Sequence, residues 1–233
     1  EDKMIKMLLA EVTEWEKVDQ DTPVIPAIHY IVTTAQLNPG RDNKYILRMP
    51  DTEIDKAVNI ANKINGIVFL DVQVGLSNLK DELVHLEKYL KMSQIHLGID
   101  PEFYMRDGKK PGTVIGTVDA KEINETINYL SQIVKDNNLP PKILVIHRFT
   151  RKMLTNYQDI KPTPEVQVVI DMDGWGIKEK KISTYKNVIY SEPVQFTGFK
   201  FFYKNDTLDK SSRMLTKQEV LKLQPIPIYI QYQ

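Results

Sequence analysis

Ionisable residues follow four successive apolar segments of the chain. Asp71 follows Val-Phe-Leu, Asp100 follows Leu-Gly-Ile and Asp171 follows Val-Val-Ile, while His147 follows Leu-Val-Ile. A single Asp or His at such a position is commonly a turn or cap residue. Four in succession favour a site instead, because converging carboxylates repel one another and folding does not require them to meet. Two carboxyl groups, one acting as acid and one as base or nucleophile, are the minimum for glycoside hydrolysis.

Two sets of candidate site residues follow from these segments and their adjoining loops. The candidate catalytic residues are Asp100, Glu102, Asp71, His147, Asp171 and Asp173. The candidate substrate-binding residues are His29, Gln73, Tyr104, Arg148, Trp175 and Lys200. Asp100 and Glu102 share one side-chain parity and are the preferred acid–base pair. His96 lies in mid-strand, so we expect it to be structural.

The same side chains allow a divalent-metal-dependent hydrolase as an alternative. Carboxylates would supply oxygen ligands and a histidine would supply a nitrogen. The candidate ligands are Asp71, Asp100, Glu102, Asp171, and His29 or His147. The HxH, HExxH, DxDxDG, GxSxG and GxxxxGK[ST] spacings are absent. We therefore expect no bound cofactor, unless it is a divalent metal, and neither serine-nucleophile nor ATP-dependent chemistry.

Two loops at the predicted strand ends have the composition of a binding surface. Residues 100–119 form a long connection, and its Phe103, Tyr104 and Met105 are costly to leave in water. The segment Asp171-Met-Asp-Gly-Trp-Gly176 places Trp175 between glycines beside two carboxylates. An aromatic platform beside acids suits the apolar face and the hydroxyls of a sugar ring. A lid over the rim of the fold explains Trp175 equally well.

The elements that would carry these residues alternate between strand and helix patterns. Strands are predicted at 24–34, 66–73, 95–100, 142–147, 166–171, 194–202 and 226–231, with 45–48 or 188–190 as an eighth. Helices are predicted at 3–17, from 50–51 to 64, from 79 to 90 behind an N-cap at Ser77, from a capping box at Asp119 and Glu122, at 178–186 and at 216–223.

This alternation predicts an α/β fold with a parallel sheet. The favoured architecture is a (β/α)8 TIM-type barrel with some irregularity, in a single domain over residues 1–233. The carboxyl ends of its strands would then gather the ionisable residues at one rim. A doubly wound open sheet is less favoured, because no GxGxxG follows the first predicted strand.

Composition narrows the possible partners. The 233 residues include 31 Lys+Arg and 31 Asp+Glu, a balance that is not typical of a nucleic-acid-binding protein. No apolar run is long enough to span a bilayer, and the absence of cysteine excludes disulfides and thiolate metal sites. The chain begins at Glu1 without an initiating methionine, which is compatible with a signal peptide or a lipid anchor upstream.

Five segments resemble a group of uncharacterised bacterial proteins. These segments are 68–73, 99–103, 111–116, 139–150 and 171–176. The group is often described as secreted or lipid-anchored and as loosely glycosidase-like. The resemblance implies a (β/α)-barrel and an extracellular or envelope-anchored location, and it supplies no mechanism. Asp171-Met-Asp173 is also similar to the DxDxE motif of chitinase-like families, with Trp175 at the position of their Glu.

We therefore expect a carbohydrate-active hydrolase whose partner is a glycan or polysaccharide, with no nucleic acid involved. Two alternatives stay open. One is the divalent-metal-dependent hydrolase at the same edge of the sheet. The other is a non-catalytic surface lipoprotein that binds a glycan or a protein.

Overall fold

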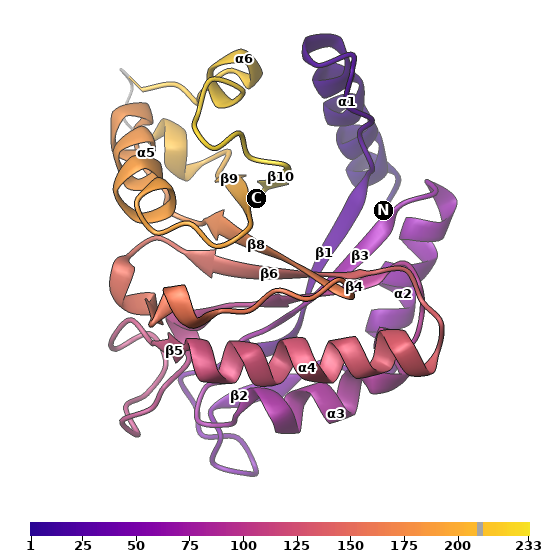
Figure 1. Cartoon of the computed structure of the whole chain (residues 1–233), viewed down its shortest axis with the longest axis vertical. Helices are drawn as coiled ribbons and strands as arrows, with labels where there is room; N and C mark the ends of the chain where they lie inside the picture. Colours follow the sequence, from indigo (N-terminus) through magenta and orange to yellow (C-terminus); the bar gives the residue numbers. More distant parts are fainter. Residues whose placement is uncertain (209–211) are drawn as a thin grey trace.

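One curled sheet of eight strands dominates the computed structural model, which describes residues 1–208 and 212–233. Its strands are β1 (Ala27–Ala35), β2 (Ile46–Arg48), β3 (Ile67–Val72), β4 (Ile95–Ile99), β6 (Lys142–Arg148), β8 (Val166–Met172), β9 (Phe196–Phe201) and β10 (Tyr229–Tyr232). The order across the sheet is β10-β9-β8-β6-β4-β3-β1-β2. All neighbouring pairs are parallel except β1 and β2. The sheet has the shape of a half-barrel (Figure 1).

The helices vary widely in length. They are α1 (Asp2–Val18), α2 (Asp51–Lys63), α3 (Leu79–Leu90), α4 (Ala120–Asp136), α5 (Lys178–Thr184) and α6 (Lys217–Val220). A π-helical segment, Tyr185–Tyr190, continues α5. Two short strands, β5 (Val118–Asp119) and β7 (Leu154–Thr155), pair in a separate sheet. Among the described residues, no helix combines the length and the hydropathy needed to cross a membrane.

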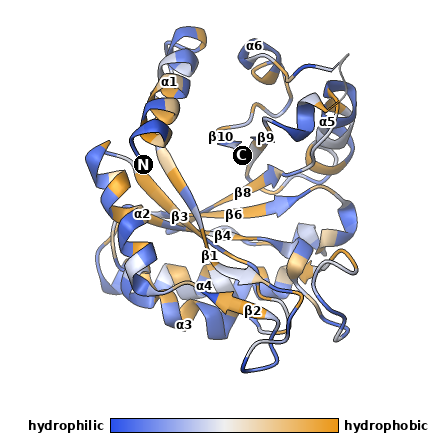
Figure 2. Ribbon diagram, turned by 180° about the vertical axis from the view of Figure 1, so that it is seen from behind, coloured by the Kyte–Doolittle hydropathy of each residue, from blue (hydrophilic) through white to orange (hydrophobic). Residues whose placement is uncertain are grey.

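The main core lies largely between the sheet and helices α2, α3 and α4, which cover its convex face, and it continues into the π-helical segment through Tyr185, Val188 and Ile189. Apolar residues run along the central strands, whereas the helices carry mixed polar and apolar residues (Figure 2). Phe69, Val145 and Val169 form a second, smaller apolar cluster. Side chains alternate along a strand, so residues two positions further along β3, β6 and β8 face the same side as this small cluster.

The α/β class and the parallel sheet are confirmed, but a closed TIM-type barrel is not shown. The predicted eighth strand at 45–48 forms as β2, yet it runs antiparallel and occupies the outer edge of β1. Residues 188–190, the other candidate, lie in the π-helical segment. In place of a crossover helix between β6 and β8 there are only short 3-10 turns and β7. Within the described chain, no backbone ladder joins β10 to β1.

Local capping shows one difference from the prediction. Asn78, not Ser77, is the N-cap of α3, and its side chain accepts a hydrogen bond from the Asp81 backbone N–H. The capping box of Asp119 and Glu122 at the start of α4 is confirmed. An Asx side chain reaches the first turn as readily as a serine, so two adjacent cap residues are hard to rank from sequence.

Helix α1 stands beside the open side of the half-barrel, near the C-terminal strands (Figure 1). Trp15 Nε1 donates a 2.9 Å hydrogen bond to Tyr232 Oη of β10. Glu11 accepts hydrogen bonds from Lys217 (2.7 Å) and Tyr203 (3.3 Å). These contacts join the two ends of the chain, and they place α1 where a barrel would be closed by further strands.

Candidate active site

Three inward-facing residues meet at the C-terminal ends of the central strands. Asp71 of β3, His147 of β6 and Asp171 of β8 each lie two residues beyond a member of the small apolar cluster. All three are buried, with exposed fractions of 3%, 1% and 0%. His147 Nδ1 lies 3.0 Å from Asp171 Oδ2, and His147 Nε2 lies 3.8 Å from Asp71 Oδ1. The imidazole is therefore held between two carboxylates.

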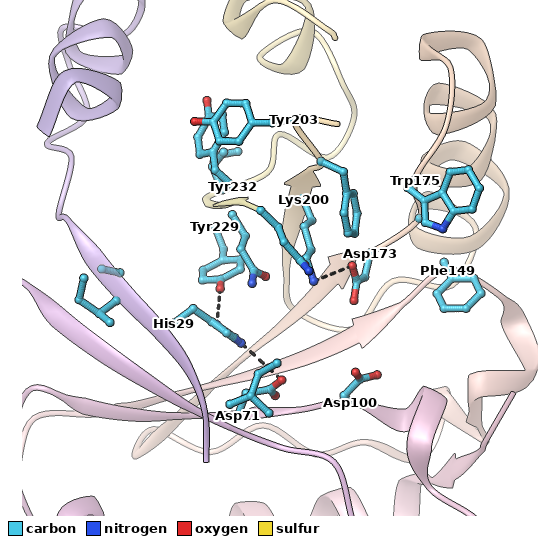
Figure 3. Close-up of a pocket in the computed structure, with 18 of the residues that line it drawn as sticks. His29, Asp71, Asp100, Phe149, Asp173, Trp175, Lys200, Tyr203, Tyr229 and Tyr232 are labelled. Atoms are coloured by element: carbon cyan, nitrogen blue, oxygen red, sulfur yellow. Dashed lines mark hydrogen bonds and ion pairs between the residues drawn. The ribbon is translucent and has the colours of Figure 1, made fainter. Parts of the chain in front are cut away.

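His29 joins this group from β1, the strand next to β3 in the sheet. Its Nε2 lies 3.5 Å from Asp71 Oδ2, and its Nδ1 lies 2.8 Å from Tyr229 Oη of β10 (Figure 3). The rings of His29 and His147 meet edge-on with centroids 5.2 Å apart. A side-chain hydrogen bond thus connects β1 with β10, between which the described residues form no backbone ladder.

Two glycines make room for the carboxylates. A Cβ atom at Gly98 would lie 2.6 Å from Asp71 Oδ1, and one at Gly198 would lie 2.6 Å from Asp171 Oδ1. Strands β4 and β9 therefore need glycine beside these side chains. Glycine inside a strand often marks such a close approach. It is a sequence signal that could have located the buried carboxylates without the structure.

Asp100, immediately after β4, has different surroundings from Asp71. It is buried, and it accepts hydrogen bonds from Gln73 Nε2 at 3.1 Å and from the Glu102 backbone N–H at 3.2 Å. Gln73 is fixed in turn, because its Oε1 accepts from the Ala35 backbone N–H at 3.0 Å. The ion pairs of the site involve the other aspartates. Among the described residues, the hydrogen-bond partners of Asp100 are thus neutral.

These surroundings move the pKa values of the two carboxyl groups in opposite directions. Burial alone raises the pKa of Asp71, but the charges of His147 and the second imidazole outweigh burial and lower the pKa to about 2. Burial raises the pKa of Asp100 to about 7, with a further contribution from Asp71 and against the charge of His147. Burial lowers the pKa of His147, but the surrounding carboxylates raise it to about 9. At neutral pH Asp71 is ionised, while Asp100 retains a proton in part of the molecules.

Two further charged groups complete the site. Lys200 of β9 is nearly buried, and its Nζ lies 2.9 Å from Asp173 Oδ1. Asp173 Oδ2 lies 3.5 Å from His147 Nδ1. Glu102 is partly exposed, and burial together with the charge of Asp173 raises its pKa. Lys200 therefore compensates one of several converging negative charges.

A cavity of about 1240 Å³ opens over these groups (Figure 3). The predicted site residues that line it are His29, Asp71, Gln73, Asp100, Glu102, Asp173, Trp175 and Lys200. Its aromatic lining residues are Phe103, Phe149, Trp175, Phe202, Tyr203, Tyr229 and Tyr232. The indole of Trp175 is 50% exposed, and Lys180 Nζ lies 5.0 Å from its ring centroid. His147 and Asp171 do not line the cavity, and both are buried.

Two predicted substrate-binding residues lie away from this cavity. Arg148 follows His147 and faces the opposite side of the sheet, where its guanidinium donates to backbone carbonyls of the following loop and pairs with Glu192. Tyr104 Oη donates a 2.9 Å hydrogen bond to Glu122. Both side chains are buried with polar partners of their own, so the structure leaves them no contact with a ligand in the cavity.

Several site residues were missed in the sequence. The sequence predicts a strand at Tyr229 and no role for its side chain, although Tyr229 is the partner of His29. It predicts no role for Phe149 and Tyr232 either, and both line the cavity. Tyr229 and His29 are 200 positions apart, so only the tertiary fold shows that they meet. His96, in contrast, accepts a hydrogen bond from the Ile143 backbone N–H at 3.0 Å, in keeping with the expected structural role.

His29, Asp71 and His147 form a group that could hold a metal ion. One ligand atom from each residue lies within 4.8 Å of the others. Two imidazoles and one carboxylate are a donor set used by zinc and by other first-row divalent metals. The prediction that this site could bind a divalent metal is therefore supported by the presence of a suitable set of donor atoms.

Comparison with known proteins gave no significant match, either to a family model, to a curated protein or to a solved structure. The resemblance to a bacterial glycosidase-like group and the expected envelope location stay predictions. Function must be argued from the site, since a fold class hosts many activities.

Proposed function

We propose that the protein is a carbohydrate-active hydrolase that cleaves glycosidic bonds in this cavity. In this proposal Asp100 donates a proton to the leaving group. Asp71, held by His29 and His147, is the ionised group that acts on the attacking water. One observation carries the proposal: two buried carboxyl groups line one cavity, one beside two imidazoles and the other with neutral hydrogen-bond partners in the part of the chain that the structure describes. Such opposed environments separate an acid from a base.

The sequence predicts Asp100 and Glu102 as the acid–base pair. In the structure, Asp71 is a better partner for Asp100 than Glu102 is. Burial and the charge of Asp173 raise the pKa of Glu102, as burial does for Asp100. Two carboxyl groups whose pKa values are shifted in the same direction are not separated into an acid and a base. The pKa of Asp71 is shifted downward instead, because the neighbouring imidazoles stabilise its negative charge.

The cavity supports a carbohydrate polymer as the substrate. Its volume of about 1240 Å³ exceeds the roughly 300–1,000 Å³ that is usual for small-molecule pockets. Phe149 and Trp175 come from the loops after β6 and β8, whereas Tyr203 and Tyr232 come from the β9–β10 region (Figure 3). Aromatic side chains on separate walls, with carboxyl groups between them, suit a chain of sugar rings with apolar faces and polar edges.

The test is the Asp100→Asn variant, assayed on a panel of oligosaccharides and on aryl glycosides with acidic leaving groups. Loss of a general acid should reduce kcat on oligosaccharides by about 10²–10⁴-fold. The loss should be much smaller on aryl glycosides, because an acidic phenol leaves without protonation. A purely structural role of Asp100 would lower both activities equally.

Asp107→Asn is the matched control, because Asp107 is exposed in the long loop after β4. It should keep the activity of the wild type. Full turnover of oligosaccharides by Asp100→Asn would refute the assignment. Binding of glycans by the wild type without cleavage of any panel member would select the non-catalytic alternative.

A further inference from the structure

We propose that His29, Asp71 and His147 bind a single divalent transition-metal ion, with zinc as the best fit. The inference deepens the proposed function, on which it rests only for the chemistry assigned to the ion. It concerns the nature of the group that acts on the attacking water: a metal-bound water in place of a carboxylate alone.

The ligand atoms already converge. Both imidazoles present Nε2 to the same carboxylate, at 3.5 Å from Asp71 Oδ2 for His29 and at 3.8 Å from Asp71 Oδ1 for His147. In a tetrahedral zinc site with the usual bond lengths, neighbouring ligand atoms are about 3.3–3.5 Å apart. The observed separations are slightly too long for good hydrogen bonds, and they leave room for an ion between the three groups.

Two of these atoms lack any other partner. Asp71 Oδ1 and His147 Nε2 are buried, and neither has a hydrogen-bond partner within residues 1–208 and 212–233. A buried polar atom without a partner is costly, so native proteins rarely retain one without a reason. A metal ion bound between them would satisfy both atoms at once.

The outer contacts orient both imidazoles for metal binding. Tyr229 Oη lies 2.8 Å from His29 Nδ1, and Asp171 Oδ2 lies 3.0 Å from His147 Nδ1. Metal ligation requires neutral imidazoles, so a bound ion would displace a proton from His147 Nε2. With the remaining proton on each Nδ1, the lone pair of each Nε2 would point toward Asp71. This arrangement of a histidine between a metal and an oxygen acceptor recurs in metal sites and fixes the tautomer of the ligand.

The negative charge of the site and its access to the cavity also favour a bound cation. Four aspartates gather here, Asp71, Asp100, Asp171 and Asp173, and Lys200 is the lysine paired within the group. A divalent cation would reduce this repulsion. His29 and Asp71 line the cavity, so an ion between them would keep an open position for water on the substrate side. Such an ion lowers the pKa of its bound water and supplies a nucleophile at neutral pH.

The test is zinc binding by the chelator-treated, dialysed protein, measured by calorimetry and by elemental analysis. The wild type should bind about one equivalent of Zn²⁺ per chain. Tyr229→Phe, which removes only the outer partner of His29, should bind about 10–100-fold more weakly. His29→Ala and Asp71→Asn should lose more affinity than Tyr229→Phe does. Visible absorption of the Co²⁺-substituted protein would report whether the coordination is tetrahedral.

His85→Ala is the control for adventitious binding, because His85 is exposed on α3, and it should bind as the wild type does. Circular dichroism of each metal-free variant shows whether it has folded. Only folded variants are compared with the wild type, and the comparison needs at least one of Tyr229→Phe, His29→Ala and Asp71→Asn. Absence of stoichiometric binding by the wild type, or unchanged affinity in folded His29→Ala and Asp71→Asn, would overturn the inference. That result would leave Asp71 acting without a metal, a role that the Asp100→Asn assay tests separately.

Discussion

At the scale of single residues, burial has opposite consequences for two carboxyl groups of one site. Asp71 and Asp100 are both almost inaccessible to water, yet only Asp71 is beside imidazoles. The pKa of Asp71 falls to about 2, whereas that of Asp100 rises to about 7. Because both groups are buried, the identity of their partners decides which way each pKa moves.

The raised pKa of Asp100 has a consequence for folding stability. A carboxyl group whose pKa is raised in the folded state binds more protons folded than unfolded, so its effect on stability becomes less favourable as the pH rises from about 4 to about 7. Asp100→Asn removes this contribution. The free energy of unfolding of the variant minus that of the wild type should therefore increase across this interval, by about 1.4 kcal/mol for each unit of pKa shift.

Urea denaturation at several pH values between 4 and 8 measures this difference. Comparison of variant with wild type is needed because Asp71, Asp173, Glu102 and His147 face Asp100 and titrate as well. A difference that does not change with pH would show that Asp100 ionises at its ordinary pKa.

At the scale of elements, glycines in two strands determine where the carboxylates fit. Gly98 of β4 faces Asp71 of β3, and Gly198 of β9 faces Asp171 of β8. Each pair of residues is directly opposite in the parallel register. The sheet can therefore bury a carboxylate in each pair only because the neighbouring strand carries no side chain there.

Gly98→Ala tests this packing. The added Cβ would lie 2.6 Å from Asp71 Oδ1 and 3.2 Å from His29 Cε1, so Asp71 must move. We expect a loss of about 1–3 kcal/mol in the free energy of unfolding, which is typical of overpacking. In the double variant Gly98→Ala/Asp71→Ala most of that loss should disappear, as a double-mutant cycle by urea denaturation can show. If the losses in the free energy of unfolding from Gly98→Ala and Asp71→Ala simply add, the strain caused by the added Cβ does not come from Asp71.

At the scale of the whole molecule, the open side of the half-barrel is bridged by side chains rather than by strand pairing. Tyr229 reaches His29, and Tyr232 accepts the hydrogen bond of Trp15 from α1. The cavity lies at this seam and includes residues from α1 as well as from β10. A closed barrel would have filled part of that space with backbone.

Tyr232→Phe tests the bridge between α1 and β10. The change removes the hydroxyl that accepts from Trp15 Nε1 and keeps the ring, so the free energy of unfolding should fall by about 1 kcal/mol. Hydrogen exchange should become faster in α1 before other helices are affected. Tyr190→Phe is the control, because Tyr190 is exposed and should be neutral. Equal effects of the two changes would show that the bridge contributes nothing.

The sequence by itself determined the alternation of strands and helices, and with it the parallel sheet. It also determined that ionisable residues end successive strands, since these features depend on local periodicity. Side-chain alternation between His147 and Arg148, and a glycine within the strand at Gly98, are signals of the same kind, although Arg148 is among the predicted substrate-binding residues and no prediction uses Gly98. These signals are local, so they can be recognised without knowing which strands are neighbours.

Only the tertiary structure decided which of the candidate groups meet. The contact of Tyr229 with His29 depends on pairing between distant segments, and so does the placement of His147 between Asp71 and Asp171. Whether the sheet closes into a barrel also depends on long-range pairing. Strand β2 pairs antiparallel with the outer edge of β1, and β2 and β10 are the two unjoined edges of the sheet that the structure describes. Such long-range pairing is a balance of packing over the whole chain, which no single segment encodes.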